Sequence, residues 1–422
     1  MNYKTLMQRK LPEYICQLLI SIGEISHQMG YTAFVVGGFV RDFILGRDNL
    51  DVDIVIEGNG LDFASKFAEI NKGKVKSHER FGTAVVILPD GFKIDVATAR
   101  TEIYDRPGAL PKVQFCFIKA DLFRRDFSIN AMAIDLSDNQ FGELVDPLNG
   151  YSDLRNGLIR VIYDLSFEDD PTRIFRAIKY EQRYGFSMET QTEKLLKLAV
   201  RRNFLDTITK QRLRNEILLI LKEYELDMTV KRMEHFDILK YIHPKLKFTG
   251  TIGIRFIMQK FLTSVVSSKF SIDKVDKVLL NLIILLDQLD ESQVAEVSRT
   301  LVLEKKYSEA LLMANDRLNI ALRAIDRSVS PSEIYESLKG FPIEVLMFGV
   351  IISQSDARKN RIMLYITALR NKKPFITGND LKKMGYPEGP LYSEILTKTF
   401  YAQLDGVIKD KNQAIDFVMS NG

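Results

Sequence analysis

The stretch VVGGFVRDFILGRDNLDVDIVIE, residues 35–57, decides how the first part of this chain folds. A β-like run ends at Gly37 and Gly38, a short helix is expected next, and a second β-like run follows. Glycines between a strand and a helix let backbone N–H groups approach an anion closely, and the helix N-terminus adds a positive dipole. The order predicts a phosphate-binding turn, and Arg41, one helical turn further on, is a second candidate for the same phosphates.

The second β-like run carries the acidic residues Asp51 and Asp53. Residues i and i+2 of a strand point to one face, with Cα atoms roughly 6.5–7 Å apart. Like charges on one strand face repel each other unless something bridges them. Two carboxylates beside a phosphate-binding turn suit Mg²⁺, which takes carboxylate oxygens, water and substrate phosphates. We therefore expect metal-assisted phosphoryl transfer, with Asp95 on an adjacent strand as a third catalytic carboxylate or, alternatively, a partly buried hydrogen-bonded residue.

The segments around this stretch predict an α+β head with a small mixed sheet, followed by an extended all-helical neck, body and tail. Runs rich in Val, Ile, Thr and Phe predict strands at 32–38, 52–57, 83–88, 92–98 and 126–136. Apolar spacing of three and four predicts a helix over 11–30, and PDG at 89–91 predicts a hairpin. A helix should begin near Pro171 and stop at Gly185, with helical periodicity to about residue 370. The expected domains are 1–165, 166–245 and 246–422.

Composition excludes several classes of protein. The 422 residues are 46% hydrophobic and 27% charged, as in folded soluble proteins, and no apolar run reaches the ~18 residues of a membrane span. Two cysteines, Cys16 and Cys116, are too few for a disulfide framework or a zinc site, and four scattered histidines lack ligand spacing. The net charge of +4 permits a nucleic-acid partner without demanding one. We expect a cytoplasmic protein with no membrane association and no obligate protein partner.

The motif GGFVRD…LGR…DVDIV resembles the first motif of the polymerase-β-type nucleotidyltransferases. Within them, most of residues 30–245 is similar to the class II tRNA nucleotidyltransferase and bacterial poly(A) polymerase family. This resemblance implies that Asp51 and Asp53 are the catalytic metal ligands. It also places Gly38 and Arg41 where the family binds nucleotide phosphates.

The segment LFRRDFSINAMA, residues 122–133, resembles the second motif of that family. The resemblance places Arg125 on the triphosphate and Asp126 near the ribose 2′-hydroxyl, with Asn130 in support. The residue types suit these roles, because arginine donates two hydrogen bonds to phosphate and a carboxylate accepts from a hydroxyl.

The segment DDPTRIFRAIKY, residues 169–180, resembles the fourth motif, which selects the base. We expect Asp170 and Arg173 to lie three apart on one helix face and to act as the template. A carboxylate accepts from the amino group of cytosine or adenine, and a guanidinium donates to the ring acceptors. Arg176 should lie on the same face and reach phosphate.

Two further segments follow the family pattern. TITKQRLRNEILLIL, residues 207–221, resembles the fifth motif, and its Arg212 and Glu216, at i and i+4, are expected to brace the neck helix. The loop 103–112, with Gly108 and two prolines, occupies the position of the family's flexible loop, which is tied there to switching from C to A addition.

The resemblance implies a template-independent enzyme that adds CMP and AMP, from CTP and ATP with Mg²⁺, to the 3′ end of tRNA. Four basic clusters are compatible with a path for a tRNA arm: 245–247, 305–306, 358–361 and 370–373. An A-only enzyme, a CC-only enzyme and a poly(A) polymerase share this chemistry. A non-catalytic RNA-binding protein is the alternative of a different class, and the acidic pair argues against it.

Overall fold

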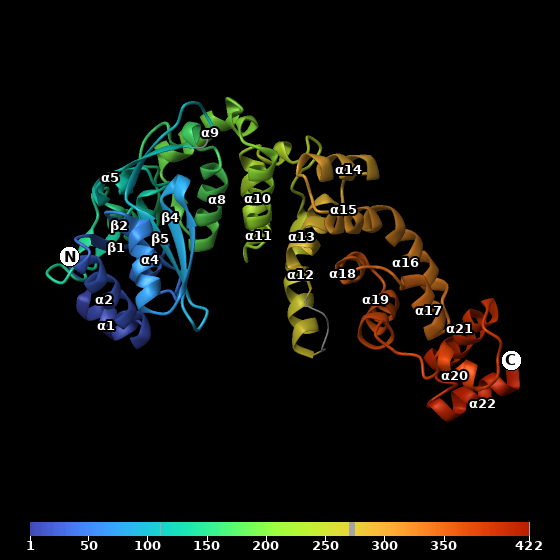
Figure 1. Cartoon of the computed structure of the whole chain (residues 1–422). Helices are drawn as coiled ribbons and strands as arrows, with labels where there is room; N and C mark the ends of the chain where they lie inside the picture. Colours follow the sequence, from blue (N-terminus) through green and yellow to red (C-terminus); the bar gives the residue numbers. More distant parts are fainter. Residues whose placement is uncertain (110, 270–274, 422) are drawn as a thin grey trace. The chain divides into compact units, whose positions relative to one another are not determined.

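The computed structural model describes residues 1–109, 111–269 and 275–421. Its internal contacts divide the chain into two compact units, Met1–Glu216 and Ile217–Gly422 (Figure 1). The first unit carries the sheet, and the second is helical throughout its described residues, so the expected fold class is confirmed. The three-part division with boundaries near 165 and 245 stays a prediction. In the described parts of the chain, no helix has both the length and the apolar character needed to cross a membrane.

Seven strands form the main sheet of the first unit, in the order β3-β4-β5-β2-β1-β8-β9. Their bounds are β1 Thr32–Val36, β2 Val52–Glu57, β3 Lys74–His78, β4 Thr83–Ile87, β5 Lys93–Thr98, β8 Ala133–Asp135 and β9 Leu144–Val145. Only β2 and β5 are parallel, so the sheet is mixed. The strand expected over 126–136 is wrong for its first half, because Ser128–Asn130 form a 3₁₀ turn and only β8 pairs with β1.

Helices cover the two faces of this sheet differently. On one face, α2 (Glu13–Gln28) lies against β1, and α4 (Gly60–Ile70) lies against β3, β4 and β5. The two helices contact each other, and α1 (Lys4–Lys10) packs on α2. On the opposite face, α5 (Ile118–Phe123) joins Phe34, Val55 and Ala133 in an apolar cluster. The hairpin of β4 and β5 forms around residues 88–92, as PDG predicts.

Shorter elements complete the first unit. They are α3 Gly38–Leu45, α6 Gly150–Asn156, α7 Ser166–Asp169, α8 Arg173–Tyr184, α9 Thr190–Arg201 and α10 Lys210–Ile220, with the pairs β6 Arg100–Ile103 and β7 Lys112–Phe115, and β10 Leu158–Ile159 and β11 Ser187–Met188. α8 ends at Gly185 as expected but begins two residues after Pro171. The β10–β11 pair means that the segment after Asp170 is not wholly helical.

The second unit is a succession of helices. They are α11 Leu226–His235, α12 Gly250–Lys269, α13 Lys277–Leu286, α14 Glu291–Thr300, α15 Lys305–Leu312, α16 Leu318–Arg327, α17 Pro331–Leu338, α18 Ile343–Ile352, α19 Asp356–Leu364, α20 Gly378–Lys383, α21 Pro390–Leu404 and α22 Lys411–Asn421, with π-helical turns over 313–317 and 365–369. α13 and α18 are buried along almost their whole length and form its core with α12. The last three helices enclose a separate apolar cluster around Leu381 and Ala414.

Candidate active site

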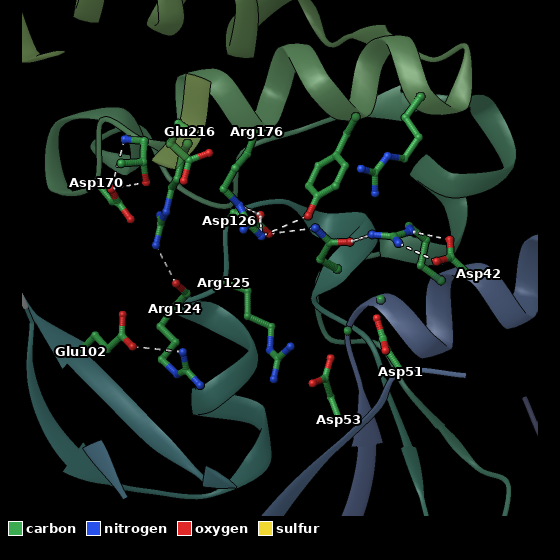
Figure 2. Close-up of a pocket in the computed structure, with 18 of the residues that line it drawn as sticks. Asp42, Asp51, Asp53, Glu102, Arg124, Arg125, Asp126, Asp170, Arg176 and Glu216 are labelled. Carbon is green, nitrogen blue, oxygen red and sulfur yellow. Dashed lines mark hydrogen bonds and ion pairs between the residues drawn. The ribbon is translucent and has the colours of Figure 1, made fainter. Parts of the chain in front are cut away.

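A cavity of about 500 Å³ lies in the first unit, and Figure 2 shows the side chains that surround it. Its walls come from the turn between β1 and α3, the start of β2, the end of α5, the start of α8 and the side of α10. All of the site residues predicted from the sequence line this cavity except Asp95. Segments that are up to 179 residues apart in the chain, from Gly37 to Glu216, therefore line one cavity, as the expected order of motifs requires.

Gly37 lies at the turn into α3 with φ +66°, a backbone conformation that side-chain-bearing residues rarely adopt. A Cβ atom there would lie 3.0 Å from Nη1 of Arg125, so the absence of a side chain also leaves room for that guanidinium. Arg125 donates from Nη2 to Asp121 at 3.0 Å. Its Nε is buried and has no hydrogen-bond partner among the described residues. A buried donor without a partner at the cavity wall suits an anionic ligand, which would accept its hydrogen bond.

The acidic pair stands at the same end of the cavity (Figure 2). β2 begins at Val52, so Asp51 precedes the strand rather than lying in it, and its N–H donates to the side chain of Asn49 at 2.9 Å. Asp53 is directly opposite Asp95 in the parallel register of β2 and β5. Burial raises the pKa of Asp53 to about 6, and the charges of Asp95 and Asp51 add to this, while Arg125 opposes it.

These observations fit a divalent cation held by Asp51 and Asp53. Carboxylates that repel each other gain from a bridging cation, and their oxygens are the donors that Mg²⁺ prefers. In the described residues, no group of three or more His, Cys, Asp or Glu side chains is arranged to hold a metal. Two carboxylates would then need the oxygens of a substrate to complete the ligand set, which is the usual arrangement for Mg²⁺ at nucleotide sites.

The middle of the cavity is a chain of hydrogen bonds. Both oxygens of Asp42 accept from Arg41, at 2.9 and 2.8 Å, and Arg41 also donates to Asn130. Asn130 donates to Asp126 at 3.0 Å, and Arg176 forms an ion pair with Asp126 at 2.6 Å. Burial alone would raise the pKa of Asp126, but Arg176 and Asn130 outweigh it and hold that pKa below its ordinary value. In this structure Arg176 is directed to Asp126, and its expected contact with phosphate stays a prediction.

The base-selecting residues differ from expectation in one respect. Asp170 precedes α8 with an extended backbone, so Asp170 and Arg173 do not share a helix face. Oδ1 of Asp170 accepts from the N–H and the hydroxyl of Thr172, which turns the chain into α8. Arg173 donates to Tyr163, to Ser166 and to the carbonyl of Arg124. The residues still line the same wall, because the turn places the carboxylate beside the first residue of the helix.

Arg212 makes contacts beyond the expected brace with Glu216, on whose carboxyl its positive charge also acts. Arg212 forms an ion pair with Asp170 at 2.7 Å and donates to the carbonyl of Gly108 at 3.0 Å. The N–H of Gly108 donates to the carbonyl of Asp169 at 3.2 Å. The loop 103–112 is thus attached to the base-selecting segment, although its Leu110 lies outside the described residues. Glu216 lines the cavity, and burial raises its pKa.

Several lining residues were not predicted from the sequence: Asp42, Asn49, Glu102, Tyr104, Arg124, Thr172, Tyr180, Arg183 and Glu216. The sequence could have predicted Arg124 as a lining residue, because it stands beside Arg125 in the same charged run. No sequence pattern points to Glu102 and Tyr104, because the pairing of β6 brings this segment to the cavity. There Tyr104 and Arg124 both donate to Glu102.

Comparison with known families gives two matches. Residues 33–160 match the family described as the poly A polymerase head domain, and residues 185–249 match the family described as a probable RNA and SrmB-binding site of polymerase A. The first match contains the acidic pair and the Arg-Arg-Asp run, and the second begins just after α8.

Curated relatives and solved structures agree with these matches. An A-adding tRNA nucleotidyltransferase of Geobacter sulfurreducens is 39% identical over 95% of this chain, which spans 46% of that protein. Another, of Halalkalibacterium halodurans, is 31% identical over 99% of this chain and 95% of its own length. The structure of a Thermotoga maritima CCA-adding enzyme with tRNA is 34% identical, with a TM-score of 0.78, and covers 100% of this chain and 98% of that one. Two further structures are CCA-adding enzymes, one with ATP (TM-score 0.81) and one with CTP (TM-score 0.79). Each is 33% identical to this chain, and each comparison covers 100% of this chain and 98% of the other.

Proposed function

The chain belongs to the tRNA nucleotidyltransferase family, and we propose that it adds CMP and AMP, taken from CTP and ATP, to the 3′ end of tRNA. The observation that carries this proposal is the joining of the acidic pair, the orphaned Nε of Arg125 and the base-selecting segment in one cavity. A volume of about 500 Å³ suits a ligand the size of a nucleoside triphosphate. A cytoplasmic location is part of the same proposal.

The reaction requires one bond to form and one to break. The 3′-oxygen of the RNA bonds to the α-phosphorus, and the bond from that phosphorus to the β-phosphate oxygen breaks, so that pyrophosphate leaves. Arg125, with the backbone at Gly37 and Gly38, would hold the triphosphate beside Asp53. Asp126 would accept from the ribose 2′-hydroxyl in exchange for one of its present donors, because N–H groups of Phe127, Asn130 and Arg176 already fill its four lone-pair sites.

Asp51 and Asp53 are the residues that would hold Mg²⁺. When bound, the ion supplies positive charge that stabilises the charge developing on the phosphates and favours ionisation of the attacking hydroxyl. Asp95 faces Asp53 from the neighbouring strand, where its negative charge would raise the attraction of this end for a cation. The remaining contribution of the protein is to position donor and acceptor for in-line attack.

Base selection would fall to Asp170 and Arg173. Arg173 is held by three acceptors, so its guanidinium has a fixed direction, and Asp170 is fixed by Thr172 and Arg212. A rigid carboxylate and guanidinium side by side suit the amino group and ring acceptor of cytosine or adenine, whereas uracil and guanine present the wrong edges.

The second unit would bind the body of tRNA. Residues 217–249 of this unit fall within the match to an RNA-binding family, and this match and the likeness to a tRNA complex support the role. Among the basic clusters, Arg358 forms an ion pair with Asp326 and Arg361 donates to the carbonyl of that residue. Lys305 is largely exposed and makes a longer ion pair, at 3.6 Å, with Glu309. The exposed lysines are therefore the better candidates for contacts with phosphate.

Addition of A alone is the second candidate, because both curated relatives named above are A-adding tRNA nucleotidyltransferases. The experiment that separates the two activities incubates the chain with Mg²⁺ and tRNA that ends either at the discriminator base or at CC, with each nucleoside triphosphate. Extension of the first tRNA by C and of the second by A supports CCA addition. Extension of only the second supports A addition, and a long A tail indicates a poly(A) polymerase. Retention of tRNA without extension of either end contradicts both candidates.

A further inference from the structure

A buried carboxylate that the proposed reaction does not use lies behind the wall of the nucleotide cavity. Asp121 stands in α5, and its side chain is fully excluded from solvent. It does not line the cavity, so it is not placed to touch a nucleotide there. A buried charge is costly unless it is paired, and the partners of this carboxylate therefore indicate its role.

Asp121 holds both arginines of the Arg-Arg-Asp run, each through a different oxygen atom. Oδ1 accepts from Nη2 of Arg124 at 2.7 Å, from its Nε at 2.9 Å and from the N–H of Arg100 at 3.1 Å. Oδ2 accepts from Nη2 of Arg125 at 3.0 Å. Burial would raise the pKa of Asp121, but the charges of Arg124 and Arg125 outweigh it and hold that pKa below its ordinary value. The carboxylate is therefore charged at neutral pH and attracts both guanidinium groups.

The two guanidinium groups differ in what they can offer to a ligand. Arg124 also donates from Nη1 to Glu102 at 3.1 Å, so each of its three side-chain nitrogens has an acceptor in the protein. Among the described residues, Asp121 is the one hydrogen-bond acceptor of the Arg125 guanidinium, and the buried Nε has none. Nη1 of Arg125 lies beside the turn at Gly37. Asp121 thus holds one nitrogen of Arg125 and leaves the others at the phosphate-binding turn.

We propose that Asp121 is a positioning residue that directs Arg125 to the phosphates of the incoming nucleotide. The inference rests on the proposed function and names a residue that acts without touching the nucleotide. An arginine that is anchored at one nitrogen before the ligand binds loses less conformational freedom on binding than an unanchored one. Because every nucleoside triphosphate carries the same phosphates, Asp121 affects the affinity for CTP and for ATP alike, unlike the base-selecting residues.

The test replaces Asp121 by asparagine, which has nearly the same shape but no charge. The probes are ATP, CTP and inorganic tripolyphosphate, and calorimetry without tRNA gives their dissociation constants. We expect all three constants to rise by the same factor of about tenfold, the contribution of one hydrogen bond to a charged group. The matched control is Asp153→Asn, which removes a buried aspartate that is paired with Arg160 and does not line the cavity. The control should lower the melting temperature and leave the three constants at the wild-type values.

A double-mutant cycle separates positioning from a general loss of structure. In a chain that already carries Arg125→Ala, Asp121→Asn should have no further effect on the three constants, because the group that it directs is absent. A full additional effect in that background would overturn the inference. Unchanged constants in Asp121→Asn would overturn it too, as would a change in the ratio of the constants for ATP and CTP.

A second variant keeps the inference testable if Asp121→Asn does not fold. Arg125→Lys retains the positive charge but has a single side-chain nitrogen, which the buried carboxylate of Asp121 would hold. This variant should bind tripolyphosphate as weakly as Arg125→Ala, and a wild-type dissociation constant would overturn the inference. A wild-type chain that shows these binding effects but extends no tRNA would instead contradict the proposed function alone.

Discussion

The two ends of the cavity satisfy their charges in opposite ways. At the carboxylate end, Asp53 and Asp51 repel each other, and the buried Nε of Arg125 has no partner in the described structure. At the base-selecting end, Asp170 is paired with Arg212, and Arg173 has three acceptors. The first end therefore has polar groups that a ligand could pair with, whereas the charged groups of the second end are paired with other groups of the protein. We therefore expect the first end to act on the phosphates and the second end to select the base through a geometry that these contacts fix.

The largest effect is expected at the carboxylate end. Asp53→Ala should lower incorporation of both C and A by at least about a thousandfold, because charge stabilisation at the phosphates supplies several kcal/mol. Thermal unfolding should not shift to lower temperature, since the change removes a repelled carboxylate. Single-turnover extension of tRNA and a melting curve measure the two properties. Turnover close to wild type in Mg²⁺ would remove Asp53 from the reaction.

At the other end, Arg173→Ala should change selection more than chemistry. A good bidentate contact with a base discriminates by about 1–3 kcal/mol, or roughly 5- to 150-fold. We expect UTP and GTP incorporation to rise by this factor relative to CTP and ATP. The rate should also fall, because a displaced base displaces the α-phosphate. Competition between nucleotides in a single-turnover assay measures the ratio, and Arg202→Ala, an exposed change on the same unit, is the control. Lost activity with unaltered preference would show that this end is only structural.

The smallest effect is expected for Arg212, which acts through Asp170. Arg212→Ala should reduce discrimination among nucleotides by a few-fold, since Thr172 still holds Asp170, and Arg212→Lys should restore part of it. Glu216→Gln provides the contrast. If Arg212 serves only to brace its helix through Glu216, both changes should lower the melting temperature equally and leave nucleotide preference unchanged.

The sequence predicted the chemistry of the first end better than the arrangement of the second. Gly37, Asp53 and Arg125 each belong to a local pattern whose residue types dictate the ligand. The partner of Asp170 was missed because Arg212 is 42 residues away, and i and i+4 spacing favoured Glu216 instead. The error over 126–136 has a similar cause, since β-like composition did not reveal the 3₁₀ turn that positions Asn130.

By itself, the sequence determined the α+β head, the helical remainder and the residue types that we propose for a metal-assisted phosphoryl transfer. These follow from local periodicity, glycine conformation and the spacing of charges, which neighbours in the chain decide. Only the tertiary structure decided which charges are paired and which are left for a ligand, and that the Arg125 guanidinium lies beside the turn at Gly37. The physical reason is that pairing depends on contacts between distant segments and on strand register, which a local pattern does not contain.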